Sequence, residues 1–284
     1  MAEIIGLFVA GISRGMIYFL LSSGLTLVFG VLGLLNFAHG TFYMVGVFLC
    51  FSVVGWLNFG FAFLIVPAVL VILGAIFEIG LLRRIYKAEH IIQLLLTTGL
   101  VFILSDVVKL IWGLEPKSIS MPGALRGFVN VLGIIIPIYN LFIIAVSTII
   151  LLAMLRILYR TKVGSFIRAC QIDPDLALAT GINYGRVCLL VFTIGCALAG
   201  LTAVCAAPMV TAILGMDSHI IIVAFIIVII GGVGSIKGVL VASLIIGIVE
   251  SIGISFLPLF SEAFLYAIVV LTLAVRPQGL FGQA

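Results

Sequence analysis

The sequence predicts an all-α fold: a polytopic helical membrane protein with eight or nine transmembrane segments and a broken or re-entrant element near residues 30–44. Of its 284 residues, 64% are hydrophobic and only 8% are charged, whereas soluble domains average about 25% charged residues. Apolar runs of roughly 20 residues recur along the chain, each long enough to cross about 30 Å of hydrocarbon. The runs are continuous, unlike the alternating segments of about 10 residues that build a membrane barrel.

Nine apolar runs are candidate spans, at about 4–30, 37–57, 60–82, 91–113, 131–155, 187–208, 218–233, 238–257 and 262–275. Eight spans plus one broken or re-entrant piece would fit the pattern equally well. The largest polar segments, 114–130 and 156–186, are too short to bury a core of their own. We therefore expect a single transmembrane domain over residues 1–284.

The distribution of Lys and Arg predicts the orientation of the spans. If nine spans alternate, one side receives most of the basic residues: Arg83, Arg84, Lys87, Arg156, Arg160, Lys162, Arg168, Arg186, Lys237 and Arg276. The other side receives Lys117 and Arg126. The positive-inside rule places the basic side in the cytoplasm, so the C-terminus is expected inside and the N-terminus outside, unless an early re-entrant run turns the N-terminus inward. A net charge of +4 located beside spans indicates contact with membrane lipid and no nucleic-acid partner.

A polar, glycine-containing stretch interrupts the apolar pattern at residues 30–44. It holds Asn36, Phe37, His39 and Gly40 between two apolar runs. An unpaired backbone group in lipid is costly, so a bilayer tolerates such a break only where protein or a water-filled cavity surrounds it. The stretch therefore predicts a wall of the substrate pathway, with Phe37 at an apolar gate. A packing role for the histidine and for the aromatic ring fits the same pattern.

The segment 156–186 predicts a short helix on the basic side. Asp173 is a favourable N-cap, Pro174 suits the first helical position, and Asp175 complements the positive end of the helix dipole. Gly181 suits the C-terminal stop. Helices of about two turns are marginal in water on their own, so other structure must hold this one. Packing against the chain's own spans and docking to a cytoplasmic partner both fit.

The glycine-rich block 231–238 resembles a nucleotide-binding loop only superficially. A Walker A loop needs Gly-Lys followed by Ser or Thr, whereas Lys237 precedes the last glycine and no strand comes before the block. The spacing also departs from a dinucleotide fingerprint. We expect a tight turn that packs two helices closely, formed by Gly231, Gly232, Gly234 and Gly238. The chain is therefore expected to bind no ATP or other cofactor itself, and its energy to come from a partner or a gradient.

Few ionisable residues fall inside the apolar runs, and they form no catalytic set. Asp106 and Lys109 are spaced for a structural ion pair or, alternatively, a substrate contact. Glu250 lies within the eighth run, where a charge costs about 2.5–3.5 kcal/mol; it is expected to accept an interhelical hydrogen bond or to belong to the substrate pathway. Arg14 is expected to face a partner subunit or to snorkel to the interface. The three histidines are dispersed and the five cysteines form no C-x-x-C pair, so no metal site and no catalytic residue is predicted.

Four blocks, in this order, carry a resemblance to a known family. They are Gly24–Gly40 with its Asn-Phe-Ala-His-Gly element, Gly164–Asn183, Gly231–Gly238 and Arg276–Gly282. Together they resemble the branched-chain amino acid family of ABC importer permeases, and most of all the H-type subunit of the leucine/isoleucine/valine system. The resemblance covers nearly the whole chain.

The resemblance implies a permease subunit of the bacterial inner membrane that forms the translocation path for small neutral or aliphatic amino acids, with branched-chain ones expected. It implies a paralogous permease as partner, or a second copy of this chain, together with two cytoplasmic subunits that bind and hydrolyse ATP. It also implies a periplasmic or lipid-anchored solute-binding protein. The loop within 156–186 would couple the chain to an ATPase, through Arg168, Asp173, Pro174, Asp175, Ala177 and Gly181.

Two other functions stay open on the sequence. A permease for urea, short amides or small aromatic acids would share the same blocks, and its binding protein would set the solute. A passive channel or a gradient-driven secondary transporter belongs to another class. Coupling to a proton or sodium gradient needs several carboxylates at mid-depth, for which only Glu250 and Asp106 are candidates.

Overall fold

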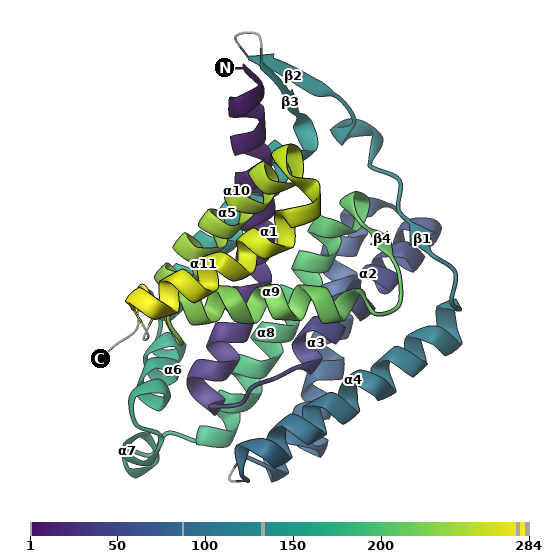
Figure 1. Ribbon diagram of the computed structural model, residues 1–284. Helices are drawn as coiled ribbons and strands as arrows, with labels where there is room; N and C mark the ends of the chain where they lie inside the picture. Colours follow the sequence, from purple (N-terminus) through teal and green to yellow (C-terminus); the bar gives the residue numbers. More distant parts are fainter. Residues whose placement is uncertain (1, 87, 132–133, 277–278, 282–284) are drawn as a thin grey trace.

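The computed structural model of the protein describes residues 2–86, 88–131, 134–276 and 279–281, and it confirms the predicted fold class (Figure 1). Within these ranges, seven helices are long and apolar enough to cross a membrane, and two further apolar helices are shorter. The seven are α1 (Ala2–Leu32), α2 (Ala38–Trp56), α3 (Phe59–Gly80), α4 (His90–Trp112), α5 (Ile138–Arg160), α8 (Tyr184–Ala206) and α10 (Ile236–Phe256). The two shorter ones are α9 (Met216–Gly231) and α11 (Ser261–Val275).

These helices follow the nine apolar runs closely, but the start of the fifth run was predicted wrongly. Where the run was expected to begin, at residue 131, the chain forms an antiparallel hairpin of β2 (Phe128–Val131) and β3 (Ile134–Pro137). Three consecutive isoleucines favour a strand, and Pro137 then serves as the N-cap of α5. Hydropathy alone does not separate such a strand from a helix.

Short elements complete the chain between the long helices. A second, two-residue pairing joins β1 (Lys117–Ser118) to β4 (Thr211–Ala212), so the segment after α4 is tied to the segment after α8. Single 3-10 turns lie at η1 (Leu82–Arg84), η2 (Gly123–Leu125), η3 (Ala207–Met209) and η4 (Pro258–Phe260). Two further helices, α6 (Lys162–Ile172) and α7 (Pro174–Ala179), lie between α5 and α8.

The two ends of the bundle differ in charge. At one end, Arg156 and Arg160 of α5 line a shallow hollow with Lys237 of α10, and Arg83 of η1 reaches the Gly185 carbonyl at the start of α8. We call this the basic end; α6 and α7 extend from it (Figure 1). The β2–β3 hairpin and the N-terminus lie together at the opposite end, which we call the hairpin end (Figure 1). Lys87, which was also predicted to lie on the basic side, is outside the described residues.

Two helices begin in the middle of the bundle instead of at an end. Helix α1 runs to the basic end, where Tyr184 donates a hydrogen bond to the Val31 carbonyl. The chain then turns back without helical structure over residues 33–36, and His39, at the start of α2, contacts the Leu21 carbonyl halfway along α1. Helix α9 likewise starts beside α2, because Asp217 in its first turn accepts a hydrogen bond from Thr41 of α2. The predicted broken element is therefore present, and a second break precedes α9.

The two breaks belong to an inverted repeat. Helix α1 runs from the hairpin end and is followed by a break, a returning helix α2 and the pair α3–α4. Helix α8 runs from the basic end and is followed by a break, a returning helix α9 and the pair α10–α11. Equivalent pairs also pack alike, since α1 lies along α10 as α8 lies along α3. Inverted repeats with discontinuous helices at the membrane midplane are an architecture of transporters.

Close backbone contact holds both equivalent helix pairs together. A Cβ at Gly15 of α1 would lie 2.8 Å from the Ser243 carbonyl oxygen of α10, and one at Gly200 of α8 would lie 2.9 Å from Cα of Pro67 in α3. Small residues allow such approach, which replaces the hydrophobic driving force that lipid removes. These glycines therefore fix how the two halves pack on each other.

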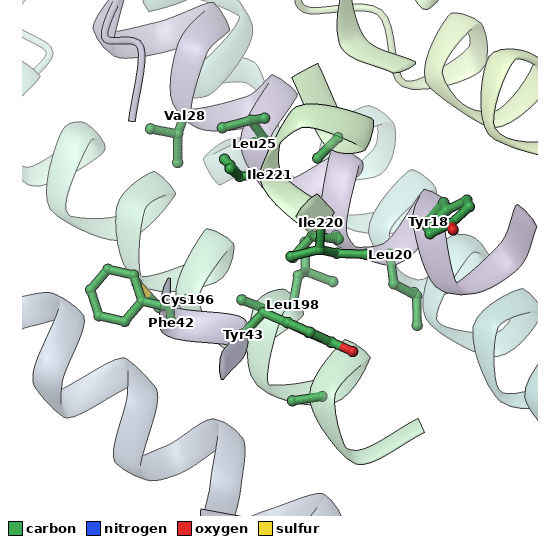
Figure 2. Packing of buried hydrophobic residues seen from close by; sticks show 14 of the residues in the cluster. Tyr18, Leu20, Leu25, Val28, Phe42, Tyr43, Cys196, Leu198, Ile220 and Ile221 are labelled. Carbon is green, nitrogen blue, oxygen red and sulfur yellow. The ribbon is translucent and has the colours of Figure 1, made fainter. Parts of the chain in front are cut away.

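The core lies where α1, α2, α8 and α9 meet. Figure 2 shows part of it, with Leu25 and Val28 of α1, Phe42 of α2, Cys196 of α8 and Ile221 of α9, all buried. By contrast, α3, α4 and α5 carry rows of exposed large apolar side chains. Such rows are what lipid-facing helices present, so the central four helices hold the break inside protein.

Candidate functional site

The start of α2 packs inside the protein at the predicted break. His39 is 1% exposed, and its Nε2 lies 3.1 Å from the Leu21 carbonyl oxygen. Because a carbonyl only accepts, this nitrogen carries the proton. A Cβ on Gly24 would lie 3.0 Å from Cε1 of the imidazole, so the ring fits where the two helices approach most closely. The imidazole therefore satisfies a backbone carbonyl of α1 inside the bundle.

Asn36 differs from His39 because its side chain has no partner. The residue is 1% exposed, and neither its amide nitrogen nor its amide oxygen has a hydrogen bond to any described residue. A buried amide without partners costs about 1–3 kcal/mol, and such a group in a native structure requires an explanation. Its backbone carbonyl accepts a hydrogen bond from the His39 amide, which turns the chain into α2.

The starts of α2 and α9 are joined by a buried polar contact that the sequence did not reveal. Thr41 donates a 2.7 Å hydrogen bond to Oδ2 of Asp217, and both residues are buried. Gly40 faces the same helix, because a Cβ there would lie 2.8 Å from the Asp217 carbonyl oxygen. The ring of Phe37 packs in a tilted arrangement against Phe225 of α9, with 5.0 Å between the ring centroids. The one signal for this contact was an acidic residue in the first turn after a glycine.

Glu250, the fifth predicted pathway residue, lies elsewhere. It faces a cavity of about 430 Å³ near the hairpin end. There its Oε1 pairs with Nη1 of Arg14 at 3.1 Å, and its Oε2 accepts a 2.7 Å hydrogen bond from Tyr18. Arg14 thus points to α10 within the same chain, rather than to the partner subunit or interface that we considered. The structure brings Asn36, Phe37, His39 and Gly40 together and places Glu250 apart from them.

The predicted short helix on the basic side is α7. Oδ1 of Asp173 accepts hydrogen bonds from the amides of Asp175 and Leu176, at 3.0 and 2.9 Å, with Pro174 at the first helical position. The helix ends before Gly181, whose φ of +86° few other residues adopt. The caps read from the sequence thus coincide with the ends of α7.

One face of α7 packs on the chain and the other does not. Ala177 is 3% exposed, whereas Leu176 is 62% exposed and Leu178 is 52% exposed. Ala177 therefore anchors the helix to its own bundle, and the two leucines are exposed on either side of it, because successive residues of a helix lie about 100° apart. Ile172 of α6 is also exposed, and we call these three side chains the α7 surface (Leu176, Leu178 and Ile172).

Helix α6 is a feature that the sequence reading missed. The Thr161 side chain caps it by accepting a hydrogen bond from the Gly164 amide, and a Cβ at Gly164 would overlap the Leu158 carbonyl of α5. Arg168 stacks over Tyr159 at 5.4 Å, which fixes α6 against the end of α5. Burial raises the pKa of the Cys170 thiol, so that side chain is a packing residue. The threonine cap was the available signal.

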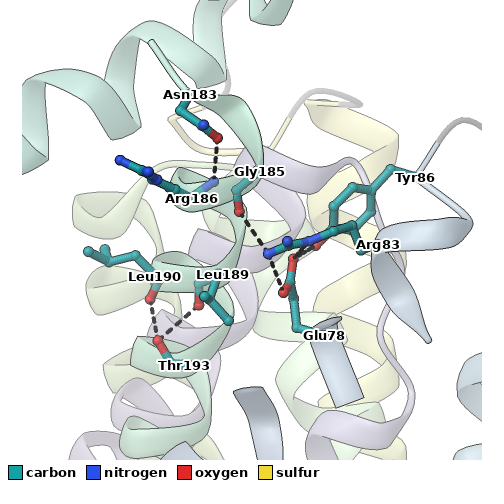
Figure 3. Close-up of polar contacts among 9 residues, drawn as sticks. All are labelled: Glu78, Arg83, Tyr86, Asn183, Gly185, Arg186, Leu189, Leu190 and Thr193. Carbon is teal, nitrogen blue, oxygen red and sulfur yellow. Dashed lines mark hydrogen bonds and ion pairs between the residues drawn. The ribbon is translucent and has the colours of Figure 1, made fainter. Parts of the chain in front are cut away.

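A polar network connects the α3–α4 turn to the start of α8 (Figure 3). The buried Glu78 carboxylate accepts hydrogen bonds from Arg83 at 3.3 and 3.0 Å and from Tyr86 at 2.5 Å. Burial, and then the hydrogen bond to Glu78, raise the pKa of the Tyr86 hydroxyl. Arg83 also donates to the Gly185 carbonyl at 3.5 Å. The first turn of α8, which follows α7 directly, is thereby tied to α3.

The glycine-rich block forms the turn between α9 and α10. Gly232 and Gly234 have φ of +92° and +78°, and a Cβ on Gly238 would overlap the Gly231 carbonyl. The Gly234 amide donates a 3.0 Å hydrogen bond to Thr26 of α1. The chain returns here near its C-terminus, where the amides of residues 280 and 281 bond the last carbonyls of α9. Residues 277–278 and 282 of the fourth block lie outside the described residues.

Asp106 and Lys109 of α4 are both exposed, and no ion pair joins them. Among the described residues, no group of three or more His, Cys, Asp or Glu is placed to hold a metal ion. The candidate functional sites are therefore the break, the cavity at Glu250 and the α7 surface.

Comparison with known proteins agrees with this architecture. The chain is 28% identical to the high-affinity branched-chain amino acid transport system permease protein BraD of Pseudomonas aeruginosa, over 97% of this chain and 94% of the relative. It is 28% identical to the corresponding LivH of Escherichia coli, over 96% and 94%, and to a probable LivH of Methanocaldococcus jannaschii, over 93% and 88%. No solved structure matches it. The family model for the permease component of branched-chain amino acid transport systems matches residues 7–273, and the chain therefore belongs to that family.

Proposed function

We propose that this chain is the permease subunit of an ATP-driven importer that carries branched-chain amino acids across the bacterial inner membrane. The names of the relatives support this solute class. The clustering of Lys and Arg at the basic end supports a cytoplasmic location for that end, and with it for the C-terminus. The hairpin end then faces the periplasm, where a periplasmic or lipid-anchored binding protein delivers the solute.

The α7 surface carries the proposal. Leu176 and Leu178 are apolar and exposed on a helix outside the membrane-spanning segments, where water would otherwise meet them. Exposed leucines on both sides of one short helix suit insertion of that helix into an apolar groove of a partner, and a helix whose ends are capped keeps its shape for docking. We assign the occupant as one of two cytoplasmic ATP-binding subunits, since the residues of this chain offer no nucleotide-binding loop.

The contacts around α7 provide a route for movement. A force on α7 reaches α8 through the short connection at residues 180–183 and reaches α3 through the Arg83–Glu78 network. Because α8 and α3 pack backbone to backbone, they move together. Their shift changes the space in which the starts of α2 and α9 meet. Asn36, without a partner here, gains one when the break opens.

The chain needs partners to complete a pathway. A paralogous permease supplies the other wall, and a second copy of this chain is the alternative. Neither ATP nor another cofactor binds this subunit in the proposed cycle. The polar groups at the break are few and the surrounding core is apolar, which suits brief passage of an aliphatic zwitterion rather than tight retention.

Reconstitution tests the function. The chain, its candidate permease partner and the ATP-binding subunits are placed in liposomes, with the binding protein added at the hairpin side. We expect uphill uptake of radiolabelled leucine that requires both ATP and the binding protein. Uphill uptake by the chain alone on a proton or sodium gradient would contradict the proposal, and preferential uptake of urea or an aromatic acid would change the solute.

A further inference from the structure

The cavity at the hairpin end combines apolar walls with a few converging polar groups. It measures about 430 Å³ and lies between α1, α2, α5, α9 and α10, with η3 and β4 at its edge. Half of the residues that line it are aliphatic or methionine, including Ile17, Met209 and Ile220. Binding sites for small molecules have this composition and a volume of about 300–1,000 Å³. The cavity is thus large enough for a single small solute.

The polar groups in this cavity carry both signs of charge. Arg14 and Glu250 lie side by side, with 36% and 14% of their side chains exposed to the cavity and solvent. Among the described residues, the guanidinium uses only Nη1 for its ion pair, so Nη2 and Nε stay available. The carboxylate accepts one hydrogen bond at each oxygen, and each oxygen has room for another.

Other polar residues add to the set, among them Asn140 and Tyr43. Asn140 of α5 is 7% exposed, lines the cavity, and makes no side-chain hydrogen bond within the described part of the chain. The Tyr43 hydroxyl of α2 also lines it, and the ring of this residue packs in the core near Ile220 (Figure 2). A buried amide directed into a cavity without a partner indicates an absent ligand or water.

An ion pair in a membrane-spanning bundle is poorly explained by stability. Replacing a buried pair with apolar residues of similar volume is often neutral or stabilising, and intramembrane ionisable residues mark substrate pathways. The pair also joins residues 236 positions apart in two helices that glycines already hold in contact. A purely structural role does not explain why the ion pair lies on the wall of a cavity.

We propose that this cavity is a receiving site for the zwitterion of an aliphatic α-amino acid. Arg14 binds the α-carboxylate through its free N–H groups, Glu250 binds the α-ammonium, and the aliphatic walls take the side chain. Asn140 donates to the carboxylate as a positioning residue. The inference rests on the proposed function, and it adds the recognition of the charged groups at a defined place in the permease.

Protection of an introduced thiol tests the site in the assembled importer in nanodiscs, with the binding protein omitted. All five native cysteines are buried, so Thr211→Cys at the cavity edge reports labelling by a maleimide. We expect leucine to slow labelling at concentrations about tenfold lower than leucinol, which lacks the carboxylate, or 4-methylpentanoate, which lacks the ammonium. A cysteine at Phe128 in the hairpin is the control and is expected to show no protection.

Two variants separate recognition from structure. Arg14→Leu combined with Glu250→Leu removes both charges and leaves no lone ion, so the fold is retained, and leucine should lose its tenfold advantage over both analogues. Glu250→Gln should abolish discrimination between leucine and 4-methylpentanoate while the preference over leucinol remains. Equal protection by all three compounds in the unmodified cavity, or none by any, overturns the site. So does discrimination that survives in the double variant.

Leucine uptake tests the proposed function, and selective protection tests the cavity. ATP-dependent leucine uptake without selective protection leaves the function standing and removes this site. Failure of leucine uptake by the wild-type importer overturns the proposed function, and the solute assigned to the cavity falls with it.

Discussion

Truncating the exposed leucines of α7 should weaken the proposed contact with an ATP-binding subunit and leave the fold intact. Leu176 is 62% exposed and Leu178 is 52% exposed, so a partner can still bury more than half of each. Full burial of a leucine stabilises by about 1.5–3 kcal/mol, which gives about 0.8–1.9 kcal/mol for each remaining portion. The double variant Leu176→Ala, Leu178→Ala should therefore lose up to about 1.7–3.4 kcal/mol of docking free energy, a weakening of about 15- to 300-fold.

Binding of the ATP-binding subunit to the permease pair in nanodiscs measures this loss directly. Leu152→Ala on α5 is the matched control, because Leu152 is 60% exposed but belongs to a membrane-spanning helix. Lipid is as apolar as leucine, so this change should leave the affinity unaltered. Thermal midpoints should be similar in both variants. An unchanged affinity in the α7 variant, or an equal loss in the control, would show that α7 does not dock the ATP-binding subunit.

Three further predictions address the break, the network and the turn. Asn36→Leu should keep or raise the thermal midpoint, because it removes an unpaired amide worth about 1–3 kcal/mol, yet it should lower leucine uptake; normal uptake would make the break a packing feature only. Glu78→Gln should destabilise the fold by about 1–3 kcal/mol. This loss is smaller than the loss on breaking a fully buried ion pair, because Arg83 is partly exposed. An unchanged unfolding midpoint would contradict this prediction. Gly238→Ala should abolish stable assembly in detergent, since its Cβ would overlap a carbonyl of α9, while Gly99→Ala, with open space around it, should be tolerated; similar chromatographic profiles for the two variants would show that the turn accommodates a side chain.

The sequence predicted those structural features that are determined by residues close together in the chain. Apolar runs longer than a bilayer core placed the long helices, because length and hydropathy are properties of a single segment. The caps at Asp173 and Gly181 fixed α7 for the same reason: a side-chain oxygen or a positive φ acts within a few residues. Helix α6 was not predicted, although the Thr161 cap is a local signal for it. The β2–β3 hairpin was not predicted because isoleucine suits both helix core and strand.

Features made by distant residues were not accessible from one sequence. The Arg14–Glu250 pair spans nearly the whole chain, and the Thr41–Asp217 contact depends on two breaks meeting in the middle of the bundle. Neither follows from spacing or periodicity. The inverted repeat explains both, since it packs α1 along α10 and brings the returning helices α2 and α9 together. Its two halves share no recognisable sequence pattern.

In the proposed mechanism, this chain is a conduit moved by ATP-hydrolysing subunits that bind its basic end at α7. A photo-crosslinking amino acid at position 176, compared with one at position 128 of the hairpin, tests this most directly in an importer that is actively taking up leucine. Position 176 should form an adduct with the ATP-binding subunit, and position 128 should not. Active uptake without an adduct from position 176, or an ATPase adduct from position 128, would contradict this mechanism.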